Sequence, residues 1–215
     1  MLLYALAAFS QKNFPVYKSE IFKDSNKESY IAYVKEDGNG GFYMVRMFKA
    51  SVIAAPSGYY IEHYDANFKL LSEYVYAPEY HAYEKYKTLL GVVLSGDKVH
   101  LIDIQYNIKE KAYLCIAHSS NINSAGFTDK ELFRLDRSVA DKIGSLSLDK
   151  IFFGAMSGTM NDNSVAAFIK DDAETSFAIA LNLKSKEAKT LKLYSFNNDL
   201  NKILEHTYVR DVKNK

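Results

Sequence analysis

The sequence lacks tryptophan and contains one cysteine and three prolines among its 215 residues. The single cysteine, Cys115, excludes an intrachain disulfide. It lies in the apolar run Ala112–Ala117, where a cysteine typically acts as a small core hydrophobe. No apolar stretch approaches the roughly 20 residues that a membrane-spanning helix needs, so we predict no transmembrane segment.

The chain also lacks an excess of charge of either sign. Its 27 basic and 26 acidic side chains give a formal net charge of +1. This balance provides no basic field to attract nucleic acid or an anionic membrane, so no nucleic-acid partner is predicted. The hydrophobic content of 48% argues against intrinsic disorder and fits a globular domain.

Motifs for phosphate, metal or nucleophilic sites are missing as well. Gly38–Gly41 lacks the spacing of a phosphate-binding loop and is predicted to be a hairpin turn. The histidines are too widely spaced for a metal-ligand motif, and no GxSxG nucleophile motif occurs. Ser57, Ser157 and the turn Asn161–Asn163 are interpreted as turn residues. We therefore predict no catalytic residue, no metal site and no cofactor.

The abundant residues are tyrosine and phenylalanine, 17 and 13 in number, and both favour strands. Segments with alternating polarity recur between turns rich in Gly, Asn, Asp and Ser, a pattern typical of antiparallel hairpins. One such turn is expected at Pro56–Gly58. The expected strands are Tyr30–Glu36, Gly41–Phe48, Tyr59–Asp65, Leu70–Tyr76, Leu89–Ser95, Val99–Tyr106, Ala112–His118, Ile151–Met156, Val165–Lys170, Ser176–Leu183 and Thr190–Phe196.

Two segments are compatible with either helix or strand. Residues 128–143 carry a capping-box pattern and apolar residues at helical spacing, but a strand followed by a loop fits equally well. For residues 198–209 we favour a turn followed by a strand, because this segment belongs to an internal repeat.

The internal repeat is faint. Tyr64–Phe68 aligns without gaps on Phe196–Leu200, and Phe127–Lys130 is expected to be a third copy between them. Three aromatic residues that enter apolar segments have a similar spacing: Tyr43, Tyr113 and Phe177. The period is about 66 residues, somewhat longer than a compact four-stranded propeller blade.

Val99–Asp103, followed by a charged turn and Ala112–Leu114, resembles segments of secreted β-propeller-like proteins of Gram-negative bacteria, most of them uncharacterised. Phe196–Ile203 is similar to their aromatic-Asp-x-x-Leu-x-Lys hairpin, although Asn197 and Thr128 stand where Asp is usual. The resemblance spans roughly residues 58–208. It implies a propeller-like fold and an exported location but no activity.

We therefore predict an all-β fold of antiparallel meander sheets, β-propeller-like, with repeats at about residues 28–86, 87–148 and 149–215. Because closed propellers typically have 4–8 blades, three repeats predict an incomplete propeller, with a β-sandwich as the alternative. Open sheet edges predict self-association, or that the chain is a fragment of a larger propeller.

The N-terminal run at residues 2–9 resembles the end of a secretory signal peptide, with small residues before a cleavage point after Ser10. No Lys or Arg precedes the run, so a buried first strand is the alternative. On the first interpretation, residues 1–10 are a signal peptide, residues 11–215 form the domain, and the protein is exported.

A tyrosine-rich stretch is the candidate ligand site, because tyrosine combines an apolar face with a hydroxyl group suited to glycan or peptide recognition. The alternative is that these rings pack one repeat on the next. The leading functional hypothesis is an exported, non-catalytic binding or scaffold module with a protein or glycan partner. The rival hypothesis is a hydrolase of glycan, peptide or ester substrates. The candidate residues are Tyr74, Tyr76, Tyr80, His81, Tyr83 and Tyr86.

Overall fold

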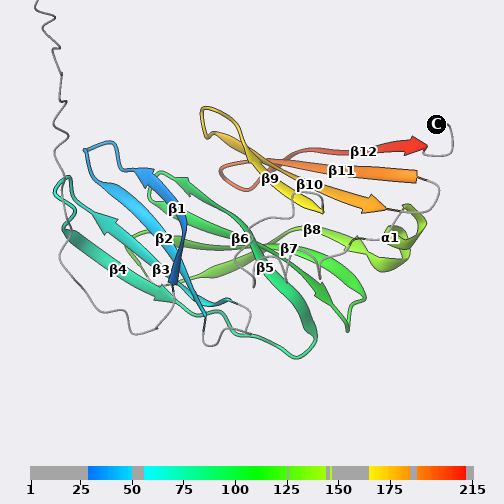
Figure 1. Cartoon of the computed structure of the whole chain (residues 1–215), viewed down its shortest axis with the longest axis horizontal. Helices are drawn as coiled ribbons and strands as arrows, with labels where there is room; N and C mark the ends of the chain where they lie inside the picture. The colour runs from blue at the N-terminus through cyan, green and yellow to red at the C-terminus, as the bar shows by residue number, and fades with distance from the viewer. Residues whose placement is uncertain are drawn as a thin grey trace, which may run out of the picture.

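A computed structural model describes residues 29–49, 56–124, 126–143, 146, 165–184 and 188–211. These residues form three four-stranded antiparallel sheets, in which every strand pairs with its neighbour in sequence, and one short helix (Figure 1). The elements are β1 (Ser29–Glu36), β2 (Phe42–Lys49), β3 (Pro56–Tyr64), β4 (Leu70–Tyr76), β5 (Glu84–Ser95), β6 (Lys98–Asn107), β7 (Ala112–Asn121), β8 (Thr128–Asp136), α1 (Arg137–Ile143), β9 (Ala166–Lys170), β10 (Ser176–Lys184), β11 (Ala188–Asn197) and β12 (Lys202–Asp211).

The fold is therefore all-β, antiparallel and propeller-like, as predicted. Within the described ranges there are three sheets, where a sandwich would have two, and none of them closes on itself. The expected strands within these ranges are all present. β5, however, begins at Glu84, whereas a repeat boundary was expected between residues 86 and 87.

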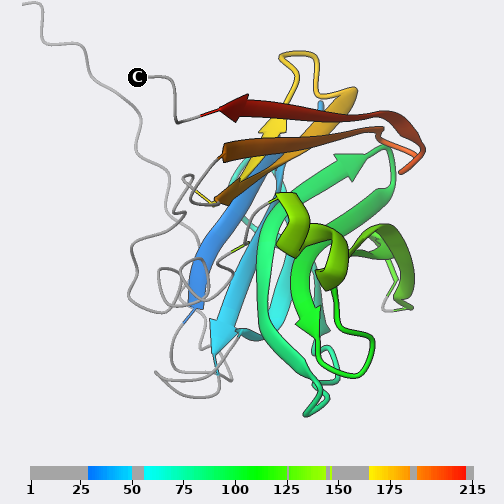
Figure 2. The same cartoon turned by 90° about the vertical axis from the view of Figure 1, so that its right-hand side faces the viewer.

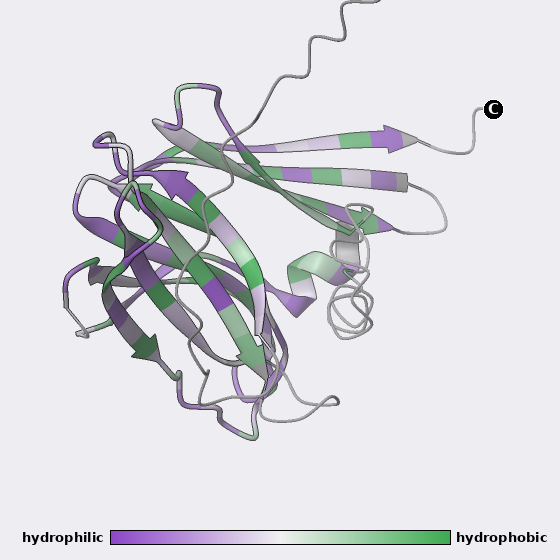
Figure 3. Cartoon of the chain, turned by 60° about the vertical axis from the view of Figure 1, so that its left-hand side comes forward, coloured by the Kyte–Doolittle hydropathy of each residue, from purple (hydrophilic) through white to green (hydrophobic). Residues whose placement is uncertain are grey.

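The middle sheet, β5–β8, is buried on both faces. One face packs against β1–β4 through Val92, Leu94 and Leu101, and the other packs against β9–β12 through Val93 and Ile102. This explains why β6 is buried along almost its whole length, as strands covered on both faces are. In the first sheet, which comes forward in Figure 3, hydrophobic and hydrophilic residues are mixed along the strands.

The first strands of the three sheets converge, as the inner strands of propeller blades do. β1 contacts β5, and β5 contacts β9 (Figures 1 and 2). The Tyr33 hydroxyl of β1 donates to the Glu174 carboxylate in the β9–β10 turn, with O···O distances of 3.1 and 3.2 Å. Lys170 Nζ lies 3.6 Å from the centroid of the Tyr33 ring. The first and third sheets are thus joined directly.

The faint repeat corresponds to matching turns in the first and third sheets. Asp65 and Asn197 each open the turn before the last strand of their sheet. Each side chain accepts hydrogen bonds through Oδ1 from the backbone N–H groups two and four residues later. Phe68 and Leu200, at the same turn position, have φ angles of 62° and 61°. The alignment of these two segments is confirmed.

The expected third copy of the repeat is wrong. Thr128 opens β8 and pairs with Ser119, so Phe127–Lys130 is not the turn. The turn before β8 starts at Asn121, whose Oδ1 accepts from the N–H of Asn123. The three aromatic positions do not match either, since they lie in a second, a third and a second strand: Tyr43, Tyr113 and Phe177.

Local predictions had mixed outcomes. The hairpin turn at Gly38–Gly41 and the burial of Cys115 are confirmed. The turn predicted at Pro56–Gly58 is wrong, because these residues begin β3. Residues 128–143 divide into β8 and α1, while residues 198–209 are a turn followed by a strand, as favoured. Predictions for residues 1–10, Ile151–Met156, Ser157 and Asn161–Asn163 lie outside the described residues.

Candidate functional site

A row of alternating charges crosses all four strands of the middle sheet, on the face toward the first sheet. It runs from Lys87 on β5 through Asp103 on β6 and His118 on β7 to Asp129 on β8. Lys87 Nζ lies 3.6 Å from Asp103 Oδ2, which lies 2.8 Å from His118 Nε2. His118 Nδ1 lies 2.5 Å from Asp129 Oδ1.

The strand register explains the row. His118 is directly opposite Asp129, and Asp103 is its diagonal neighbour on the other side. Both positions are within side-chain reach on one face of a sheet. Lys87 joins them through a bulge in β5, between Lys85 and Thr88, that places two residues opposite one of β6.

The charges of this row are largely buried. Asp103, His118 and Lys87 are 3%, 3% and 7% exposed. Buried ions are tolerated in proteins when they are paired and hydrogen-bonded. Among the described residues, Asp103 Oδ1 and Gln105 Oε1 are buried without a hydrogen-bond partner, so the pairing is incomplete.

His118 lies between the two carboxylates of the row. Burial alone lowers the pKa of its imidazole. Hydrogen bonds and charge from Asp103, followed by those from Asp129, outweigh this effect and raise the pKa above its ordinary value. The protonated ring donates through both nitrogens to the two carboxylates, which satisfies both N–H groups.

A cleft of about 360 Å³ opens beside His118, between the end of β4, the 77–83 connection and the middle sheet. The Tyr76 ring stacks on Phe127 at 3.9 Å between centroids, and its hydroxyl lies 3.1 Å from His118 Nδ1. Burial, and then the charge of Asp129, raises the pKa of the Tyr76 phenol, so its hydroxyl stays protonated. The residues lining this His118 cleft are Tyr76, Ala77, Pro78, Glu79, His81, Glu84, Lys87, Ile116, His118, Phe127 and Asp129.

The structure brings part of the predicted tyrosine-rich site to this cleft. Tyr76 and His81 line it, and the Tyr80 ring centroid lies 5.2 Å from Lys87 Nζ. Burial and then Asp103 raise the pKa of Tyr80. The other predicted residues lie elsewhere: Tyr74 donates to the carbonyl of Asn123, Tyr83 packs under Lys109, and Tyr86 lines another pocket.

Sequence reasoning missed Lys87, Asp103, His118, Asp129 and Phe127. A signal for two of them was available, because Asp103 and His118 interrupt apolar strand segments that would otherwise be fully buried. A charged residue at such a position requires a partner. Which strand would supply the partner could not be read without the register.

In the described ranges, no three His, Cys, Asp or Glu side chains are grouped as metal ligands would be. Among the same residues, no helix combines the length and apolar character needed to cross a membrane. No known protein family matches the chain, and no curated protein is detectably similar to it.

Proposed function

We propose that the protein is a non-catalytic binding module of propeller-like type and that its ligand occupies the His118 cleft. The observation that carries this proposal is the stacked pair of Tyr76 and Phe127 beside a histidine held between two carboxylates. The network is buried and costly to maintain, and costly polar networks are commonly retained for function.

A hydroxylated ligand such as a glycan fits this cleft best. The aromatic pair provides a flat apolar surface for the C–H face of a sugar ring. Carboxylates at the cleft accept hydrogen bonds from hydroxyl groups, and these charge-assisted bonds are strong. Asp129 has 61% of its side chain exposed, and Glu79 is exposed as well.

Binding is favoured over catalysis because both His118 nitrogens are already engaged by carboxylates. A general base needs a nitrogen lone pair directed at the substrate. The lining residues described for the cleft include no serine, threonine or cysteine that could act as a nucleophile.

Titration of the folded protein with a panel of mono- and oligosaccharides, followed by NMR and calorimetry, tests the proposal. We expect saturable binding with shifts at Tyr76 and His118. The Tyr76→Leu variant should bind roughly tenfold more weakly, because it removes the stacking face. Tyr208→Leu is the matched control, since Tyr208 is 53% exposed on β12, outside the cleft. Absence of binding across the panel, or equal losses in the two variants, would refute the proposal.

The hydrolase hypothesis keeps one supporting observation, namely that carboxylates of Glu84 and Asp129 line the same cleft as His118. Turnover of chromogenic glycosides and esters tests it directly. A hydrolase should lose turnover in Glu84→Gln while retaining substrate binding, whereas a binding module should show no turnover in either the wild type or this variant.

Export remains part of the proposal and is supported by the signal-like run of residues 2–9. Cell fractionation with mass spectrometry of the mature N-terminus tests it. Cleavage after Ser10 is the expected outcome.

A further inference from the structure

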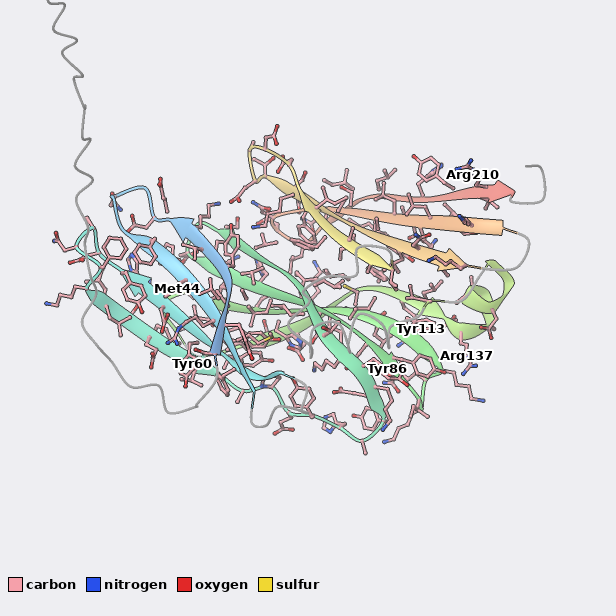
Figure 4. All side chains as sticks on the ribbon, viewed as in Figure 1. Met44, Tyr60, Tyr86, Tyr113, Arg137 and Arg210 are labelled. Atoms are coloured by element: carbon pink, nitrogen blue, oxygen red, sulfur yellow. The ribbon has the colours of Figure 1, made fainter. Side chains whose placement is uncertain are left out.

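We propose that the chain carries a second ligand site, the Arg137 pocket, which binds a small ligand that joins an aromatic or sugar ring to a carboxylate. The pocket has a volume of about 400 Å³ and lies at the end of the middle sheet beside α1. It is lined by Lys85, Tyr86, Tyr106, Tyr113, Arg137 and Leu146. Figure 4 shows Tyr86, Tyr113 and Arg137 gathered at this end of the sheet.

The Arg137 pocket is separate from the His118 cleft. Tyr106 and Tyr113 are opposite each other in the register of β6 and β7 and face the third sheet. Asp103 precedes Tyr106 by three positions on the same unbulged strand, so it points to the other face, toward the first sheet. The two sites thus lie on opposite faces of the middle sheet, and this inference does not depend on the proposed function.

The bulge in β5 contributes to both sites. Tyr86 has a φ of 57°, a left-handed backbone conformation that bulky residues seldom adopt. The bulge lets the consecutive residues Lys85 and Tyr86 line the same Arg137 pocket, while Lys87 points to the other face and lines the His118 cleft. Strained residues of this kind cluster at functional sites, and bulges commonly redirect side chains there.

The pocket is cationic and aromatic. The Arg137 guanidinium lies 6.0 Å from the centroid of the Tyr106 ring, and its NH1 donates to the Tyr106 hydroxyl at 3.4 Å. Asp141 is the carboxylate that lies near Arg137, 3.5 Å from its Nε. Among the described residues, no carboxylate lies within ion-pair distance of Lys85. The two cations therefore outnumber the single acidic group.

This chemistry selects an anionic ligand with a ring. A guanidinium matches the planar geometry of a carboxylate, and a lysine adds a second positive charge at the rim. Three tyrosine rings provide stacking and edge contacts for an aromatic or sugar ring. Leu146, which is 4% exposed, adds an apolar wall. The volume is in the lower part of the range for small-molecule sites.

Two probes that differ in charge but hardly in shape test the inference. These are 4-hydroxyphenylacetate and its neutral analogue 2-(4-hydroxyphenyl)ethanol, each titrated into the folded chain by NMR and calorimetry. We expect the carboxylate to bind saturably, with shifts at Tyr86, Tyr106 and Tyr113. The neutral alcohol should bind at least about tenfold more weakly, because it lacks the charge-assisted contact.

Variants then locate the site. Arg137→Gln should remove most of the preference for the carboxylate, and it should fold because 58% of the Arg137 side chain is exposed. Lys85→Gln should reduce the preference less. Arg210→Gln is the matched control, since Arg210 is an exposed arginine on β12. Tyr76→Leu should leave the binding of the carboxylate unchanged, which separates this site from the His118 cleft.

Equal affinity for the two probes would overturn the inference, as would an unchanged preference in Arg137→Gln. Absence of saturable binding at millimolar probe concentrations would also overturn it. Shifts confined to Tyr76 and His118 would place the carboxylate in the other cleft and refute the second site.

Discussion

His118 is held through both ring nitrogens, with Nε2 at 2.8 Å from Asp103 Oδ2 and Nδ1 at 2.5 Å from Asp129 Oδ1. One carboxylate is buried and the other is 61% exposed. The charge of the histidine therefore depends on the buried carboxylate of Asp103 and on the exposed carboxylate of Asp129, which a ligand can reach. Lys87 and Tyr76 complete the surroundings from β5 and β4.

The pKa of His118 should lie above the usual histidine value of about 6.5, because Asp103 and Asp129 stabilise the imidazolium against the cost of burial. NMR titration of the ring protons measures it. Asp103→Asn should lower the pKa, since Asp103 contributes the largest of the raising effects. A pKa that stays unchanged in this variant would show that Asp103 does not control the proton.

The same shift predicts how stability depends on pH. The folded state holds the proton more tightly than the unfolded chain. The contribution of the His118 proton to the free energy of unfolding is therefore complete below a pH of about 6.5. It is lost as the pH rises through the higher folded-state pKa. Burial lowers the pKa of Lys170 to about 8, so the charged lysine destabilises the fold at neutral pH. This destabilisation is relieved as the pH rises above about 8. The difference in melting temperature between the wild type and His118→Gln should thus shrink from pH 6 to pH 8. His206→Gln, which removes an exposed histidine outside the charged row, is the control.

The buried ion pair of Arg46 and Glu62 predicts an asymmetry between single and double variants. Arg46 Nε donates to Glu62 Oε2 at 3.0 Å, and the two residues are 7% and 1% exposed. Arg46→Leu should cost about 3–5 kcal/mol of unfolding free energy, because it leaves a buried carboxylate unpaired. Arg46→Leu combined with Glu62→Leu should recover much of that loss in urea denaturation. A double variant no more stable than the single one would contradict this interpretation.

Gly91 on β5 is predicted to be intolerant of a side chain. A Cβ atom there would lie 2.3 Å from the Phe168 ring of β9, where the second and third sheets meet. Gly91→Ala should destabilise the fold by about 1–3 kcal/mol through overpacking. Gly126→Ala is the control, because among the described residues no atom beyond its chain neighbours lies within 4 Å of its Cβ position. Adding Phe168→Leu to Gly91→Ala should restore stability, and failure to do so would place the strain elsewhere.

The edge strand β12 should mediate self-association. It pairs with β11 on one side, and its ten residues include Ile203 and Val209, which are 63% and 64% exposed. Long, apolar edges recruit further strands. Light scattering should show concentration-dependent association of the wild type, and Ile203→Lys with Val209→Lys should abolish it. A monomeric wild type would refute this prediction.

Local sequence signals predicted the strands and hairpins, because alternation and turn residues act over a few positions. The matching turns at Asp65 and Asn197 were predictable for the same reason, since each depends on one side chain and the next four backbone groups. The third copy was misplaced because Phe127 resembles the aromatic residue of the pattern, while Asn121 is the residue that makes the turn.

The charged row was not predictable because it depends on register. Asp103, His118 and Asp129 come from three strands and meet only when β6, β7 and β8 are aligned as observed. The tyrosine-rich stretch divides between two places, because Tyr76 and His81 line the His118 cleft, whereas Tyr86, in the β5 bulge, lines the Arg137 pocket. A local backbone irregularity of this kind has no clear sequence pattern.

The meander topology has a mechanical consequence for the His118 cleft. The strand ladders run within each sheet, between neighbours in sequence, whereas side chains join one sheet to the next. Tyr76 belongs to the first sheet, and His118 and Phe127 belong to the second or its β7–β8 connection. A ligand that contacts all three residues would bridge two sheets that are hydrogen-bonded only within themselves. It would resist their sliding or parting under load, a form of strength that the backbone ladders do not provide across this boundary.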